Sequence, residues 1–260
     1  MSEHAEIEIV RARASALAAL HEGPPMLVLP NAWDAASAKA FEAAGFPAIA
    51  TTSGGVAAAL GYRDHEEAPA EEMLAAARRV IGAVSVPVTV DFEAGYQMQP
   101  QQVAEILISI GAAGLNFEDS DHHGGAVLVD AEMQAERLSA IKEAANREGV
   151  PLMLNARVDV FIHRTGTPEE QLAEGLRRAQ LYRQAGADCI YPILLSDEAM
   201  IRELVTAAGV VNVNVRRDGP LSLARSAALG VRRVSYATSI FREAMAGVES
   251  IAGKIREEAG

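Results

Sequence analysis

Short apolar runs alternate with longer amphipathic stretches along most of the chain. The apolar runs have the length of buried strands, and the stretches between them carry apolar residues at helical spacing. Parallel strands joined by helices explain this alternation. The predicted strands are Met26–Leu29, Ala48–Thr52, Val86–Val90, Leu115–Phe117, Leu152–Asn155, Cys189–Ile193, Val210–Val215 and Arg233–Tyr236, and the clearest helices are Ala70–Gly82, Gln101–Ile110, Ala131–Arg147 and Pro168–Gln184.

This pattern predicts an α/β protein, a single-domain (β/α)8 TIM barrel spanning residues 1–260. Eight strand–helix units fit the 260 residues of the chain. Glycines such as Gly45 and Gly186 precede strands, where they can take the left-handed conformation that ends a helix. The alternative is an open doubly wound sheet, but no glycine-rich phosphate-binding turn follows the first predicted strand.

Composition and charge narrow the class of protein. Half of the residues are hydrophobic and 22% are charged, which is typical of a globular core. A formal net charge of −12 argues against nucleic acid as a partner, because phosphate backbones bind clustered lysine and arginine. The single cysteine, Cys189, excludes an internal disulfide. No long apolar run or basic signal peptide is visible, so we expect a cytoplasmic protein without a membrane span.

Polar side chains collect where the predicted strands end, which is where barrel enzymes hold their catalytic groups. Asp91 and Glu93 are two residues apart on one strand and can point to the same side, and Glu118 ends the next strand. Three converging carboxylates repel one another unless a cation or a proton intervenes. Oxygen ligands of this kind suit Mg²⁺ or Mn²⁺, so the set predicts a metal site, although each acid alone could be a solvated loop residue.

Arg157 follows the fifth strand and is the expected partner of a substrate carboxylate, because a guanidinium can grip a carboxylate with two parallel hydrogen bonds. The alternative is a salt bridge from Arg157 to Asp159 or Glu118. Five further substrate-binding candidates are less specific. They are the small-residue turn Thr52-Ser53-Gly54, Trp33 after the first strand, which could equally fill the core, and Asn212 on the seventh strand.

In their order along the chain, these segments resemble the isocitrate lyase/phosphoenolpyruvate mutase superfamily from about residue 31 to residue 242. The matching segments are Thr51-Thr52-Ser53-Gly54-Gly55, Leu60-Gly61-Tyr62-Arg63-Asp64, Val90-Asp91-Phe92-Glu93-Ala94-Gly95-Tyr96, Phe117-Glu118-Asp119 and Asn155-Ala156-Arg157-Val158-Asp159. The resemblance implies a barrel with Mg²⁺ held by Asp91, and with Asp64, Glu93 and Glu118 as ligands directly or through water. It implies that a 2-oxo acid binds against the metal, the Thr52-Ser53-Gly54 turn and Arg157.

The loop after the fourth strand departs from the family pattern. The lyase branch has a cysteine there that acts as a general acid, whereas this chain has Asp119-Ser120-Asp121-His122-His123-Gly124-Gly125. The loop of the mutase branch is also absent. His122 or His123 could replace the missing acid on a substitute lid, but a polar surface loop is the simpler interpretation. Cys189 lies within a predicted strand as a small core residue.

Together these features predict a Mg²⁺-dependent lyase that acts on a small 2-oxo acid or dicarboxylate through an enolate, with oxaloacetate decarboxylation as the first expectation. Asp64, Glu118 and Arg157 are the expected catalytic residues. The alternatives are a phosphonopyruvate hydrolase or mutase that acts on a P–C bond, and a non-catalytic 2-oxo acid binding protein. The resemblance also implies a homodimer or homotetramer in which the last helix, Ile240–Glu258, is exchanged between subunits.

Overall fold

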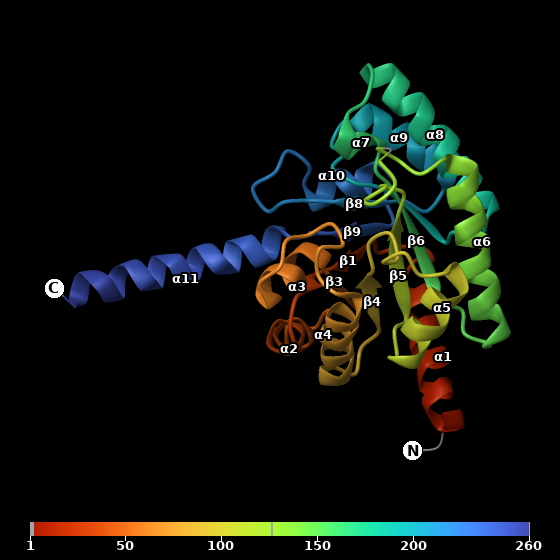
Figure 1. Cartoon of the computed structure of the whole chain (residues 1–260). Coiled ribbons are helices and arrows are strands. Elements are labelled where there is room, and N and C mark those ends of the chain that lie inside the picture. Colours follow the sequence, from red (N-terminus) through yellow and green to blue (C-terminus); the bar gives the residue numbers. More distant parts are fainter. Residues whose placement is uncertain (1–2, 126, 260) are drawn as a thin grey trace.

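A computed structural model describes residues 3–125 and 127–259 of the chain (Figure 1). Each of the eight predicted strands is present, with ends that differ from the prediction by at most three residues. A short additional strand, β2, follows β1 directly after Pro30. The strands are β1 (Leu27–Leu29), β2 (Asn31–Ala32), β3 (Ile49–Thr51), β4 (Val88–Asp91), β5 (Gly114–Glu118), β6 (Met153–Val158), β7 (Cys189–Pro192), β8 (Asn212–Asn214) and β9 (Arg233–Ser235).

All the strand pairs are parallel and follow the cyclic order of a barrel. Strands β2 to β7 pair in sequence order as a six-stranded sheet, and β1, β9 and β8 form a second sheet. The two sheets meet at both sides. β1 and β2 are separated only by Pro30, and Ile190 of β7 pairs with Val211 next to β8. The arrangement agrees with the predicted (β/α)8 architecture, and it brings the carboxyl ends of the strands to one face.

Helices connect the strands and cover the outside of the barrel. The predicted bounds of α6 and α8 match the structure residue by residue, because both starts are capped. Asp130 accepts hydrogen bonds from two amides of the first turn of α6, and Thr167 forms a capping box at the start of α8. The helices are α1 (Glu3–Ala19), α2 (Ala35–Ala43), α3 (Ser53–Leu60), α4 (Ala70–Ala83), α5 (Pro100–Ser109), α6 (Ala131–Arg147), α7 (Val160–His163), α8 (Pro168–Gln184), α9 (Glu198–Ala208), α10 (Leu223–Ala228) and α11 (Ser239–Glu258).

The predicted turn at Thr52-Ser53-Gly54 is wrong, because this segment starts helix α3. The Thr52 side chain caps the helix by accepting a hydrogen bond from the Gly55 amide. An apolar, alanine-rich stretch follows, and its helix propensity outweighs the two glycines of the first turn. The backbone amides at the start of α3 therefore point out of a helix end, which is a better anion-binding arrangement than a turn.

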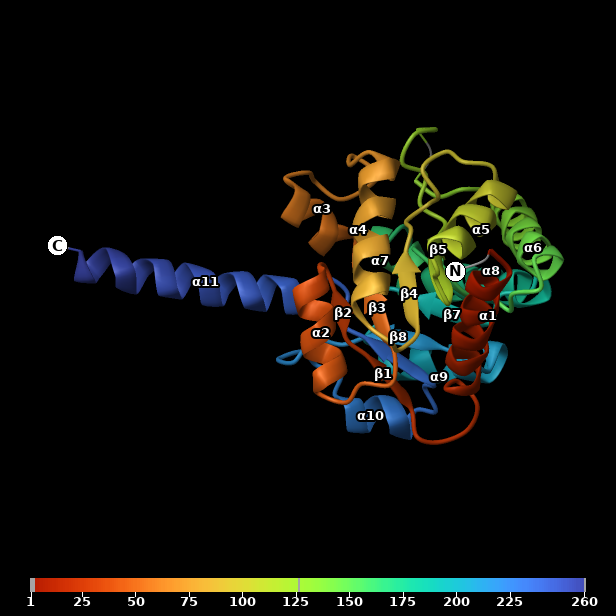
Figure 2. The same cartoon turned by 90° about the horizontal axis from the view of Figure 1, so that it is seen from below.

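The last helix, α11, extends away from the barrel in both views (Figures 1 and 2). None of its residues is buried. Its exposed side chains include Met245, Val248, Ile251 and Ile255. Among the described residues, no helix combines the length and the apolar character that crossing a membrane requires.

Candidate functional site

A cavity of about 230 Å³ opens at the carboxyl ends of the strands. Five of the predicted site residues contribute to its wall. These residues come from strand ends, the start of a helix and a loop, which the barrel brings together although up to 105 positions separate them in sequence. They are Thr52, Ser53, Asp64, Asp91 and Arg157.

The backbone around this cavity contains several residues in the left-handed region. Non-glycine residues adopt positive φ only at a cost of about 1 kcal/mol or more, and such residues concentrate at functional sites. The φ angles are 72° at His65, 58° at Glu66, 47° at Glu93, 61° at Leu194 and 49° at Ala237. Their concentration at one end of the barrel identifies this end as the functional face.

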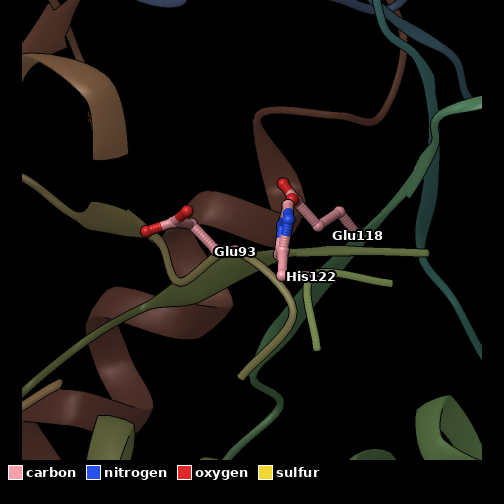
Figure 3. A group of neighbouring side chains, drawn as sticks. All are labelled: Glu93, Glu118 and His122. Atoms are coloured by element: carbon pink, nitrogen blue, oxygen red, sulfur yellow. The ribbon is translucent and has the colours of Figure 1, made fainter. Parts of the chain in front are cut away.

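Three side chains at this end could share one metal ion. One possible ligand atom from each of Glu93, Glu118 and His122 lies within 4.8 Å of the others (Figure 3). Glu93 is 2% exposed and Glu118 is 1% exposed. The Nε2 atom of His122 lies 2.6 Å from Oε1 of Glu118. This cluster contains two of the four predicted metal ligands and adds a histidine that the prediction did not include.

The other two predicted ligands, Asp64 and Asp91, line the cavity. The Ser53 amide donates to Oδ2 of Asp91 at 3.0 Å, so one amide at the start of α3 already binds a protein carboxylate. Oδ1 of Asp64 is buried, and none of the described residues forms a hydrogen bond with it. A Cβ atom at Gly54 would lie 2.6 Å from Oδ2 of Asp64, so glycine is needed for this close approach.

The acids at this site are electrostatically unsatisfied. Burial, together with the charges of neighbouring Asp64, Glu118 and Asp91, raises the pKa of Glu93 to about 8, against a hydrogen bond from Tyr96 that lowers it. Burial also raises the pKa of Glu118 well above its usual range, although Arg157 opposes the shift. Burial is also the main cause of the raised pKa of Asp91. A bound divalent cation would reverse these shifts, and the carboxylate oxygens with the unpartnered Asp64 Oδ1 fit a hard cation.

Arg157 is held by two acids of its own chain. Its Nε and Nη2 atoms donate to the two carboxylate oxygens of Asp159, at 2.6 and 2.8 Å, and its Nη1 contacts Oε2 of Glu118. Glu118 and Arg157 are also cross-strand neighbours in the β5–β6 register. The edge of the Arg157 guanidinium with two parallel donors, which we expected to bind a substrate carboxylate, therefore faces Asp159. The alternative salt bridge is present, yet Arg157 still lines the cavity.

The loop after β5 is not simply a polar surface loop. His122 has a side chain only 10% exposed, bonded to Glu118, and its ring centroid lies 5.4 Å from that of His65. His123 is 42% exposed and lies 2.8 Å from a Glu66 carboxylate oxygen. The interpretation as a surface loop thus holds for His123 and is wrong for His122. No sequence motif marks this difference, because it depends on how the loop folds back over β5.

Three predicted substrate-binding residues lie outside the cavity wall, namely Gly54, Trp33 and Asn212. Trp33 packs against Phe241 with ring centroids 5.4 Å apart, and it belongs to a small apolar cluster with Val56 and Met73. Asn212 is fully buried beside Ser235. The alternation of strand side chains could have identified Asn214 instead, because it points to the same side two residues closer to the cavity.

Sequence reasoning also missed several residues that line the cavity. Some of them belong to loops that follow β7, β8 and β9, which carry no recognisable motif. The missed residues include His65, Asn116, Asn214, Arg216, Tyr236 and Arg242.

Comparison with known proteins identifies the family. The family model for phosphoenolpyruvate phosphomutase matches residues 17–256. The chain belongs to this family. A 2-methylisocitrate lyase of Escherichia coli is 29% identical over 229 residues, which cover 83% of this chain and 75% of the relative. An uncharacterized protein of Mycobacterium tuberculosis is 36% identical over 215 residues, which cover 83% of this chain and 78% of the relative.

A solved structure of 2,3-dimethylmalate lyase, a member of the phosphoenolpyruvate mutase/isocitrate lyase superfamily, shares the fold of this phosphomutase-family chain. The two are 26% identical with a TM-score of 0.83, and the match covers 95% of this chain and 86% of the other. The resemblance seen in the sequence is thus confirmed, and so is the prediction that the chain is an enzyme of this superfamily.

Proposed function

We propose that this member of the phosphoenolpyruvate phosphomutase family is a Mg²⁺-dependent lyase that cleaves a C–C bond of a small 2-oxo acid or dicarboxylate. The observation that carries the proposal is that four acids gather at one end of the barrel. Asp64 and Asp91 line the cavity, Glu93 and Glu118 lie together beside His122, and burial raises the pKa of Asp91, Glu93 and Glu118. These four residues would hold the cation, which supplies a Lewis acid that stabilises negative charge on an oxo oxygen.

The residues of the chain support such a reaction in three ways. The amide groups at the start of α3 lie beside Asp91, where they can approach an anionic group. The Arg157 guanidinium remains charged and compensates the buried negative charge of Asp159 and Glu118. The cavity is small, so a bound substrate displaces most of the water from it.

Oxaloacetate decarboxylation is the reaction that places the fewest demands on this site. The C3–C4 bond breaks, CO₂ leaves without needing a proton, and the electron pair remains on the pyruvate enolate. The enolate then takes a proton on C3 from water. The general acid of the lyase loop is therefore not needed. His122, which is held against Glu118, could assist this protonation.

A second candidate is cleavage of a P–C bond in phosphonopyruvate. The specific observation in its favour is the match to the phosphoenolpyruvate phosphomutase model over most of the chain. Both reactions would use the same cation site and would bind the oxo-acid end of the substrate in the same way. The two candidates differ in the product that leaves, which is CO₂ in one and a phosphorus compound in the other.

The test is an assay of the purified protein with oxaloacetate and Mg²⁺ that follows pyruvate formation. Since oxaloacetate also decays in solution, the matched control is the same concentration of Asp91→Ala protein. We expect pyruvate formation well above the rate of this control. A parallel assay with phosphonopyruvate follows phosphate release. Phosphate release without pyruvate formation from oxaloacetate would favour the second candidate, and no product in either assay would favour a binding protein.

A further inference from the structure

Three arginines line the cavity, and they differ in how far their charge is already compensated. Arg157 contacts two buried acids, Glu118 and Asp159, so this group of three carries no net positive charge. Arg216 and Arg242 lie on the wall as well. Arg216 follows β8, and Arg242 lies in the first turn of α11.

Neither Arg216 nor Arg242 is strongly engaged with an acid. Arg216 contacts Asp218 at 3.4 Å, and the two side chains are 63% and 80% exposed. An exposed pair of this kind contributes little stability and is easily replaced. The guanidinium of Arg242 has no ion pair or hydrogen bond to any residue in the described part of the chain. Arg217, by contrast, is paired with Glu243 at 2.8 Å.

The two arginines also border a second, wider hollow of about 750 Å³. Arg216, Ser239 and Arg242 line both hollows, so the two adjoin at these residues. The cavity thus has two chemically different parts. Asp64 and Asp91 belong to the part that suits a cation, and the arginines mark the part that meets the wider hollow.

Weakly compensated positive charge at this position contrasts with the formal net charge of −12 of the whole chain. The overall field of the protein repels an anionic ligand, so attraction has to come from local charges. A divalent cation would supply this charge at the acidic part of the cavity. At the other part, the guanidinium groups supply it, and they are suited to carboxylates and phosphonates because they offer paired donors.

We propose that Arg216 and Arg242 form a subsite for a second anionic group of the substrate, remote from the oxo-acid end that binds near Asp64 and Asp91. This inference rests on the proposed function for the position of the oxo-acid end. It narrows the substrate class to 2-oxo acids that carry a second carboxylate or a phosphonate. A 2-oxo acid with a neutral tail would bind at the acidic part of the cavity and would leave Arg216 and Arg242 without a ligand group.

The experiment compares the affinities of ligands with and without a second acid group. Isothermal titration with Mg²⁺ present would measure pyruvate, 2-oxoglutarate, 2-oxoadipate and phosphonopyruvate against the wild type, Arg216→Ala and Arg242→Ala. The matched control is Arg217→Ala, which removes a nearby arginine that does not line the smaller cavity. We expect each of the first two variants to bind the best diacid roughly 10-fold more weakly, since a charge-assisted hydrogen bond is lost. Pyruvate affinity and the Arg217→Ala variant should change less than about twofold.

The outcomes separate this inference from the proposed function. Equal losses for pyruvate and the diacids, or no loss for the diacids, would overturn the subsite. Absence of pyruvate binding to the wild type would count against the proposed function, and the subsite would still be judged by the diacids. If no diacid bound the wild type, the subsite would be wrong too. A larger loss for phosphonopyruvate than for the dicarboxylates would assign the tail as a phosphonate, and the reverse would assign it as a carboxylate.

Discussion

Among single residues, Arg157 is the one whose environment most changes its expected role. It is 7% exposed and contacts Asp159 through two donors and Glu118 through a third. Its charge therefore offsets part of the cost of burying these two acids beside the proposed cation site, although burial still raises the pKa of Glu118. Any contact with substrate has to use the part of the guanidinium that these acids leave accessible from the cavity.

We expect Arg157→Lys to lower both stability and ligand affinity. A lysine ammonium cannot reproduce the paired bonds to Asp159 and the contact to Glu118. The buried negative charge of these acids would then be only partly compensated. The loss should be about 2 kcal/mol of unfolding free energy and roughly 10-fold in Mg²⁺-dependent affinity for a 2-oxo acid. Melting temperature and affinity are measured on the same sample. A lower melting temperature with unchanged affinity would remove Arg157 from the binding site.

His21 gives a pH-dependent prediction away from the site. Its Nδ1 atom lies 2.8 Å from the Leu17 carbonyl oxygen, and burial followed by the nearby Arg233 lowers its pKa to about 4. Native His21 stays neutral down to that pH, whereas unfolded His21 takes up a proton near pH 6.5. Its contribution to stability is therefore present above pH 6.5 and is lost as the pH falls to about 4.

We expect His21→Gln to flatten the loss of stability between pH 6.5 and pH 4, by up to roughly 3 kcal/mol for a shift of this size. Glutamine can still donate to the Leu17 carbonyl oxygen but does not titrate. Urea unfolding at several pH values measures the effect. Parallel stability curves for the variant and the wild type would show that His21 is not held neutral in the native protein.

Among the elements, helix α3 has the most direct effect on the site, since its start brings Ser53 to Asp91 and Gly54 to Asp64. A Cβ atom at position 54 would also lie 2.8 Å from Oγ1 of Thr238. We expect Gly54→Ala to displace Asp64 and to weaken Mg²⁺ binding at least several-fold. The control is Gly82→Ala on α4, where no atom lies within 4 Å of the added carbon. The control should bind Mg²⁺ like the wild type, and equal affinities for all three proteins would exclude Asp64 as a ligand.

The strands and the longer helices could be predicted from the sequence because their signals are local. Apolar runs define the strands, and caps such as Asp130 and Thr167 fix helix starts. Helix α3 was missed because two glycines at its start are typical of a turn. The capping side chain of Thr52 and the alanines that follow the glycines favour a helix instead.

The structure brings the predicted site residues to one end of the barrel where strand ends determine their position, and the predicted set is incomplete where loops determine it. Asp91 and Glu118 follow from the position at which β4 and β5 end. His122 and Arg242 could not be predicted, since their places depend on the path of a loop and on the direction of α11. The pairing of Arg157 with Asp159 was one of two readings that the sequence left open, and only side-chain geometry distinguishes them.

For the whole molecule, the exposed apolar face of α11 predicts assembly. Met245, Val248, Ile251 and Ile255 are between 40% and 60% exposed, and the helix stands away from its own barrel. We propose that a second copy of the chain covers this face in a homodimer or homotetramer. Light scattering at micromolar concentration should show at least twice the monomer mass of 27.5 kDa. Ile251→Glu should weaken assembly, and a wild-type monomer would contradict the proposal.

The account as a whole depends on a divalent cation at the carboxyl ends of the strands that binds a 2-oxo acid. The most direct measurement is isothermal titration of oxalate or pyruvate into the wild type and Asp91→Ala, each with and without Mg²⁺. We expect binding to the wild type only when Mg²⁺ is present, and no Mg²⁺-dependent binding to the variant, whose circular dichroism should match that of the wild type. Binding to Asp91→Ala with wild-type affinity and the same dependence on Mg²⁺ would contradict the assigned site.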